Sequence, residues 1–385
     1  KELGRPTTGA AYGLKSRALL YWASPLNNPG NDKERYKRSA DAAQLVVKSA
    51  FRYKLMNFTD DSESFTDLYA VSENFLQYHR EIVFSTKYNN TVSVEQQNSP
   101  LTMGGKGLTN PTQNLADAFG MANGKGINEP GSGYDEDHPY VGRDPRFYMT
   151  FAYDGSEFTV NDKTQTIETF EGGKDATATN KTATKTGYYL KKLLSPQAVW
   201  DGRTNNITRT WILMRYAEVL LNAAEAAVEL SLASVSSPDG TDMLSVATKA
   251  INDIRERAGA QLLTASLTGT TDSRDIVRKE RRKELAFEHK TKWDLRRWRV
   301  NHYEGRDGFW GEQRNKDRFS NTTRYRFRGI YPFYSTATGK WFFDVCFNYT
   351  TAGDKDFGYT PVDYYFSIPG GEVSKSPVID QQPNR

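Results

Sequence analysis

The sequence predicts a mainly α-helical fold, in which TPR-like αα-hairpins form a superhelix and a loop-rich, partly β layer packs on it. Three observations lead to this fold class. Apolar residues recur at helical spacing in paired segments near residues 10–50, 212–258 and 272–298. Glycine, asparagine, threonine and proline are frequent between the helical blocks. Aromatic residues make up 13% of the chain and supply large packing surfaces.

The first helical pair is predicted from its ends. Thr8 is a suitable N-cap, and the helix should end at Ser24, because the residue before Pro25 is disfavoured in the α region. A turn at residues 27–31 precedes a second helix over residues 33–50. Two antiparallel helices with small residues at their contact form an αα-hairpin.

The second block repeats this arrangement. We expect one helix over residues 212–230 and another over residues 243–258, stopped by Gly259. A third pair begins near Asp272. Paired helices of roughly TPR length indicate an α-solenoid, although the strict TPR consensus is not visible.

The remaining segments favour short strands and loops. Residues 82–84 and 147–151 are β-prone, and Thr338-Gly339 lies between two aromatic runs as a hairpin turn. We therefore expect one domain over residues 1–385. Its parts are helical repeats at about 8–78 and 210–300 and loop-rich segments at about 80–209 and 301–385.

Charge gives no support for a nucleic-acid partner. The chain of 385 residues has 51 basic and 47 acidic side chains, a net charge of only +4. Its most basic run, residues 278–299, is interleaved with Glu280, Glu284, Glu288 and Asp294 at roughly i,i+4 spacing. This pattern predicts a salt-bridged helix face.

The residues also argue against an enzyme with a cofactor. Cys346 is the only cysteine, so no cysteine-based metal cluster can form. No GxSxG, Walker or GxGxxG motif occurs, and the paired carboxylates stand in turn-like segments. No stretch approaches the roughly 20 apolar residues of a membrane span. We expect no catalytic residue, metal or cofactor.

The tryptophans divide into two groups. Trp211, Trp293 and Trp298 fall within helical patterns and are expected in the core, and Trp22 at a helix end is expected to pack. Trp200, Trp310 and Trp341 fall in loops or hairpins, where a ring could stack on the apolar face of a sugar. For each of these three, packing remains the simpler alternative.

The candidate ligand-binding residues are Tyr88, Asn89, Tyr134 and Trp200. Each combines a loop position with nearby amide, acidic or glycine residues that can present a ring or bind a hydroxyl group. Trp310 and Trp341 are the next candidates.

Residues 215–226, with the run Arg-Tyr-Ala-Glu at their start, resemble the central helix motif of the SusD/RagB family. Residues 280–288 and 293–298 resemble its most recognisable stretch. Further segments agree with the family in the same order: residues 9–17, 81–84, 143–147, 187–192, 251–259, 366–369 and 381–384.

This resemblance implies a non-enzymatic, surface-exposed lipoprotein of the outer membrane. Such a protein captures an oligosaccharide and delivers it to a SusC-like TonB-dependent transporter. A full family member carries a lipidated N-terminal cysteine and further helices, so we expect this chain to be a fragment whose membrane association depends on a lipid that it lacks. The family often has glycine where His289 stands, so the turn there is expected to differ.

The motif residues themselves are interpreted as scaffold. We expect Glu218, Glu225, Arg281, Arg282, Arg296 and Trp298 to pair or pack between helices. The alternative function is a peptide-binding or protein-docking module on the same scaffold. A glycoside hydrolase needs two carboxyl groups across a substrate, which sequence cannot place, and it is disfavoured because the paired carboxylates stand in turn-like segments.

Overall fold

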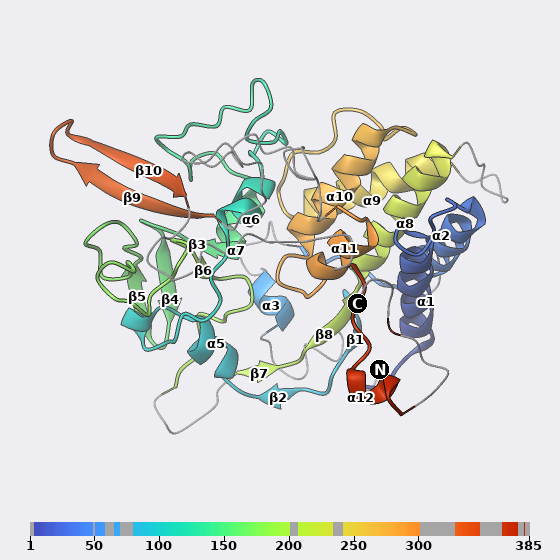
Figure 1. Cartoon of the computed structure of the whole chain (residues 1–385), viewed down its shortest axis with the longest axis horizontal. Coiled ribbons are helices and arrows are strands. Elements are labelled where there is room, and N and C mark those ends of the chain that lie inside the picture. Colours follow the sequence, from blue (N-terminus) through green and yellow to red (C-terminus); the bar gives the residue numbers. More distant parts are fainter. Residues whose placement is uncertain are drawn as a thin grey trace.

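The computed structural model describes residues 4–48, 51–57, 65–69, 80–200, 207–233, 242–300, 328–346, 364–375 and 381. In the view of Figure 1, the long helices lie on the right and the small sheets lie mostly on the left and along the lower edge. The predicted fold class is confirmed: the described part is mainly helical, and its sheets have two strands each. None of the described helices is long and apolar enough to cross a membrane.

The first predicted hairpin is present. Helix α1 (Thr8–Ala23) has Thr7 as its N-cap, one residue before the expected cap Thr8, and the Thr7 hydroxyl accepts the N–H of Ala10. It ends at Ser24 as predicted. Helix α2 (Lys33–Val47) has Asp32 as its N-cap, whose carboxylate accepts the N–H of Glu34. The two helices pack against each other and against α8.

Helix α8 (Tyr216–Leu232) is the centre of the helical part. Every residue from 217 to 230 is buried. Helix α2 and helix α9 (Met243–Arg257) both pack on it, and α9 is followed by Gly259 at φ +67° in the left-handed region, as predicted.

The helix predicted over residues 212–230 corresponds to α8, and its predicted start is wrong. Residues Ile212–Arg215 form strand β8, which pairs antiparallel with β1 (Ile82–Ser85), so the predicted strand at 82–84 is confirmed. Ile212 and Met214 are buried while Leu213 is 37% exposed, which is the alternation of a strand.

The third pair consists of α10 (Thr271–Glu284) and the shorter α11 (Thr291–Arg297). Helix α10 packs mainly on α8. Arg281 on α10 and Asp294 on α11 form an ion pair at 2.8 Å, which fixes the two helices across the turn between them.

The segment predicted as a strand at residues 147–151 is mostly helix α7 (Pro145–Thr150). Asp144 caps it by accepting the N–H of Arg146, and Pro145 occupies the first helical position. The predicted hairpin is confirmed: β9 (Gly329–Ser335) pairs with β10 (Lys340–Cys346) in register across the Thr338-Gly339 turn.

Short elements complete the described chain. The paired strands are β2 (Asn89–Asn90) with β7 (Thr208–Arg209), β3 (Phe151–Ala152) with β6 (Tyr189–Leu190), and β4 (Glu157–Val160) with β5 (Lys163–Thr166). The short helices are α3 (Phe65–Tyr69), α5 (Ser93–Asn98), η1 (Leu101–Met103), α6 (Gln113–Ala118) and α12 (Gly370–Val373).

Candidate functional site

The turn between α10 and α11 has an unusual backbone. Phe287 (φ +63°) and His289 (φ +58°) both lie in the left-handed region, which costs a residue with a side chain about 1–2 kcal/mol. The buried ammonium of Lys192 holds this turn by donating to the carbonyls of Glu284 (2.8 Å) and Ala286 (3.0 Å). The turn therefore presents the side chains of Phe287 and His289 in a fixed place.

Glu288 completes this clamp. Its carboxylate accepts from Lys192 Nζ at 2.8 Å and from Arg215 Nε at 2.8 Å. Burial opposes ionisation of Glu288, but Arg215 and Lys192 outweigh it and lower its pKa to about 2. Burial also opposes the charged form of Lys192, and for a lysine this lowers the pKa, to about 8. Glu288 opposes this shift.

The clamp belongs to a larger network of buried ion pairs. Glu284 lies against Arg215, Arg257 and Arg146, and its pKa is lowered by these cations in spite of burial. Arg146 also pairs with Asp144 at 2.8 Å and with Glu280 at 2.6 Å. These carboxylates are enclosed and bound to cations, so their geometry suits a structural role and leaves them unsuited to bind substrate.

This network corrects the interpretation of the basic run. The run is salt-bridged as predicted, but its pairs are not mainly i,i+4 contacts along one helix face, because Arg281, Arg282 and Glu284 are buried. Glu284 and Arg281 instead bind partners on other elements.

The scaffold prediction is confirmed by contacts between elements: Glu218 with Arg17 on α1, Glu225 with Arg297 on α11, and Arg296 with the carbonyl of Tyr364. Arg282 lies under the main chain of α6, with its guanidinium 3.4 Å from the Asn114 carbonyl.

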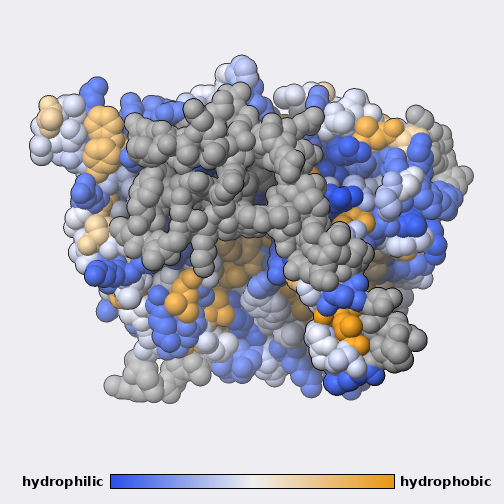
Figure 2. Space-filling model, viewed as in Figure 1, coloured by the Kyte–Doolittle hydropathy of each residue, from blue (hydrophilic) through white to orange (hydrophobic). Residues whose placement is uncertain are grey.

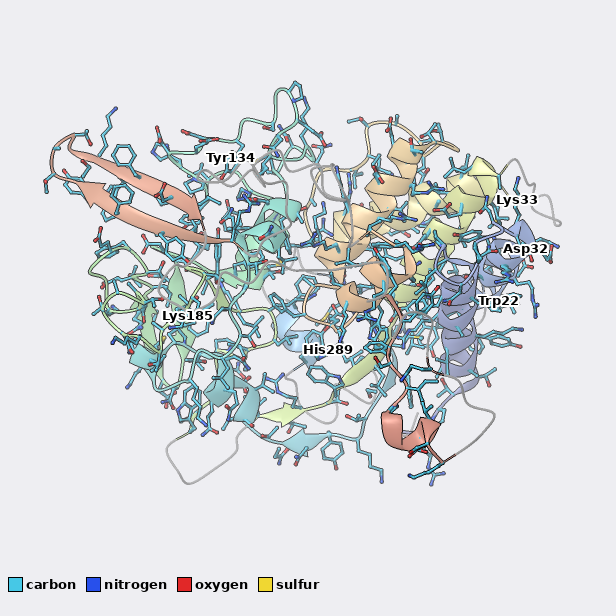
Figure 3. The ribbon with its side chains drawn as sticks, viewed as in Figure 1. Trp22, Asp32, Lys33, Tyr134, Lys185 and His289 are labelled. Carbon is cyan, nitrogen blue, oxygen red and sulfur yellow. The ribbon has the colours of Figure 1, made fainter. Side chains whose placement is uncertain are left out.

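A cavity of about 560 Å³ opens beside the turn. It lies between α5, the start of α6, β6, the residue before β8, and the stretch from the end of α10 into α11. Its apolar wall is formed by these side chains: Val94, Leu115, Leu190, Leu193, Ala286, Phe287 and Leu295. Figure 3 places His289 near the middle of the view, and Figure 2 shows hydrophobic surface in the same central region.

Two rings stand together in the cavity wall. Trp211 is half-buried and His289 is exposed, and their ring centroids are 5.5 Å apart with planes tilted by 52°. Trp211 precedes β8 and His289 precedes α11, so the pair depends on two segments that are distant in sequence.

Polar groups face the same space. Asn98, Thr109, Thr112 and Thr291 line the cavity. Thr109 donates to Asn98 Oδ1 at 2.6 Å, and Asn98 Nδ2 donates to the carbonyl of Val94 at 2.7 Å, so the amide is held in one orientation. An apolar concave wall with a few fixed polar groups is the usual composition of a small-ligand site.

The predicted ligand-binding residues lie elsewhere. Tyr88 is 42% exposed next to Asn89 on β2, at the lower edge of Figure 1. Figure 3 shows Tyr134 near the top, where its half-buried ring lies 5.5 Å from the Arg143 guanidinium. Trp200 is half-buried, and its backbone N–H donates to Asn161 Oδ1 at 2.9 Å. None of these four is among the described residues that line the cavity, and their contact with ligand remains a prediction.

The other tryptophan predictions have mixed outcomes. Trp298 is in the core, 4% exposed, as predicted. Trp293 is 45% exposed beside Phe366, so its core prediction is wrong. Trp22 packs against the guanidinium of Arg35 at 4.2 Å. Trp341 is 44% exposed on the β9–β10 hairpin, and Trp310 lies outside the described residues.

Trp211 is a site residue that the sequence pattern does not reveal. The helix expected over residues 212–230 places it in a helix core, whereas it directly precedes strand β8. Ile212, Leu213 and Met214 are all apolar, so no alternation in the sequence distinguishes this strand from a helix. Only their alternating burial in the structure does. The histidine at position 289, where glycine is expected from the family resemblance, puts a ring at the left-handed turn position beside Trp211.

Comparison with known proteins identifies the class. The model of the SusD family matches residues 74–384, so this chain belongs to that family. No curated protein matches the chain. Within the described residues, no group of three or more histidine, cysteine, aspartate or glutamate side chains could hold a metal ion.

Solved structures agree with the family assignment. A SusD-like protein from Bacteroides fragilis is 25% identical, with a TM-score of 0.69 over 100% of this chain and 66% of that one. A SusD-like carbohydrate-binding protein from the same species is 20% identical, with a TM-score of 0.63 over 96% of this chain and 64% of that one. Surface glycan-binding protein A from Bacteroides uniformis is 18% identical, with a TM-score of 0.52 over 99% and 62%. The chain thus spans slightly less than two thirds of the length of each of these structures.

Proposed function

We propose that this protein binds an oligosaccharide in the cavity beside the α10–α11 turn, with Trp211 and His289 as the ring surface. The observation that carries the proposal is the pair of rings 5.5 Å apart in a wall that also holds an oriented amide and three threonine hydroxyls. A sugar has an apolar face and a polar edge. Rings would cover the face, while Asn98 and the threonines would bind hydroxyl groups.

The family supports the ligand class. Two of the similar solved structures are described as a carbohydrate-binding protein and a surface glycan-binding protein. We extend this description to the present chain and propose that it binds without turnover. The described carboxylates nearest the cavity are engaged in buried ion pairs, which supports a binding role over hydrolysis.

The remaining family properties are proposals of the same kind. We propose that the protein acts at the outer-membrane surface as a lipoprotein and delivers glycan to a SusC-like TonB-dependent transporter. Membership in the SusD family supports this role. Co-purification of the tagged protein from the outer membrane of its host with a TonB-dependent transporter would test it, and recovery without such a partner would contradict it.

Affinity electrophoresis through a panel of polysaccharides tests the binding site. The wild-type chain should be retarded by its cognate glycan, and Trp211→Ala should bind at least about tenfold more weakly, which corresponds to about 1.4 kcal/mol. Trp341→Ala is the matched control, because it removes an exposed indole from the β9–β10 hairpin.

The possible outcomes separate the alternatives. Loss of retardation with Trp341→Ala but not with Trp211→Ala would move the site to the hairpin. Loss with Tyr88→Ala, Tyr134→Ala or Trp200→Ala alone would move it to those loops. Binding of peptides and of no glycan would favour the peptide-binding alternative.

A further inference from the structure

The charged side chains that line the cavity are all of one sign. Arg282, Lys290 and Lys292 line it together with His289, and no aspartate or glutamate is among its described lining residues. The chain as a whole has nearly equal numbers of acidic and basic residues, whereas the described cavity lining has only basic ones. The described lining of the cavity is therefore cationic.

The nearest carboxylates do not neutralise this cationic lining. Glu288 adjoins His289, but its side chain is 7% exposed and is bound by Lys192 and Arg215. Asp294 on α11 is 5% exposed and pairs with Arg281 and Arg297, both at 2.8 Å. Each carboxylate is thus buried and already paired with cations of the protein.

The cations differ in how far they are neutralised. Lys290 Nζ lies 3.4 Å from Glu218 Oε2 and 3.2 Å from the carbonyl of Leu213, so its charge is largely used within the fold. Lys292 is exposed on the first turn of α11, with its ammonium 5.5 Å from the centre of the Phe366 ring. Arg282 is 6% exposed and lies deeper in the wall. Lys292 is therefore the lining cation whose charge is most open to an anion from solvent.

We propose that the cavity prefers an acidic oligosaccharide, one that carries carboxylate or sulfate groups, over a neutral one. This inference rests on the proposed glycan-binding function and specifies its ligand class. The sugar ring would lie against Trp211 and His289, with its anionic group toward Lys292. Attraction at such an exposed site is screened by salt, because the Debye length falls from about 30 Å at 0.01 M to about 3 Å at 1 M.

The test uses matched pairs of polysaccharides in affinity electrophoresis with the 385-residue chain. De-esterified homogalacturonan is compared with its carboxyl-reduced form, and a sulfated glycan with its desulfated form. Neutral plant and bacterial glycans complete the panel. We expect at least tenfold tighter binding to one acidic member than to its neutral derivative, and weaker binding as NaCl is raised.

Charge-reversed variants locate the effect. Lys292→Glu should lower affinity for the acidic glycan at least tenfold, whereas Lys340→Glu changes the net charge equally on the distant β10 strand and should leave it unchanged. Both lysines are exposed, so both variants should fold.

Equal binding to acidic and neutral partners, or binding to neutral glycans alone, would overturn the acidic preference and leave glycan binding intact. Equal losses with Lys292→Glu and Lys340→Glu would overturn the assignment to this cavity. Failure to bind any glycan in the panel would instead contradict the proposed function itself.

Discussion

The core between α8 and α11 and the wall of the cavity both place a tryptophan near charged residues, yet they differ in what surrounds those charges. In the core, Trp298 is 4% exposed and donates to Glu225 Oε1 at 2.7 Å, while Arg297 binds the same carboxylate. In the cavity wall, Trp211 is half-buried and its neighbour His289 is exposed. Charges that are enclosed and matched stabilise the fold, whereas rings and cations open to solvent remain available to a ligand.

Acidification should have the largest effect on stability, and it should act through the buried carboxylates of the core. The carboxyls of Asp144, Glu225 and Glu288 are buried, which opposes ionisation, but neighbouring arginines and lysines lower each pKa to about 2. Because the same groups titrate near pH 4 in the unfolded chain, the unfolded state binds more protons between about pH 5 and 2. The free energy of unfolding should therefore fall as pH decreases through this range, measured by urea denaturation.

The control for this prediction is Glu225→Gln. This variant should be less stable at pH 7 and should lose less stability on acidification, because one of the three carboxyls is gone. A stability that stays constant from pH 6 to pH 3 would contradict the proposed importance of the ion pairs.

Glu284→Ala should strongly destabilise the fold. It removes the carboxylate that Arg215, Arg257 and Arg146 share, and leaving buried cations without compensation costs about 3–5 kcal/mol. Thermal unfolding measures the loss. Lys249→Ala, which breaks an exposed pair with Asp253 on α9, should cost less than about 1 kcal/mol. Similar losses for the two variants would mean that burial of the network is not decisive.

Trp298→Ala should destabilise the fold by about 3–5 kcal/mol, since it removes a buried ring and a hydrogen bond to Glu225. At a temperature where the variant remains folded, glycan affinity should be unchanged. Normal melting with lost binding would show that Trp298 belongs to the binding region and would remove the distinction between core and cavity.

His289→Gly should have the smallest effect on stability and the opposite sign. Glycine relieves the left-handed strain at φ +58°, but it also gives the unfolded chain more freedom, so the net gain should be no more than about 1 kcal/mol. The same change removes a ring from the cavity and should weaken glycan binding. Calorimetric melting and affinity electrophoresis would show the two changes, and a variant with reduced stability and normal binding would assign His289 to the scaffold.

Local signals were sufficient for much of the helical fold. The threonines near residue 8 and Pro25 bound α1, Gly259 ends α9, and Thr338-Gly339 makes the β9–β10 turn, because each acts within a few residues of its own position. Asp144-Pro145 is also a local signal, because a cap followed by a first-turn proline indicates helix α7 in place of the strand expected at residues 147–151.

The candidate site depended on contacts that no local pattern contains. The family resemblance gave the protein class, but Trp211 reaches His289 only because β8 pairs with β1, about 130 residues earlier in the chain. Likewise, the basic run is visible in the sequence as charge, but only packing decided that Arg281 is buried against Asp294 and that Lys292 is among the residues lining the cavity. A sequence specifies which residues can be charged or aromatic, and the tertiary structure decides which of them are enclosed, because burial is set by every element that packs around them.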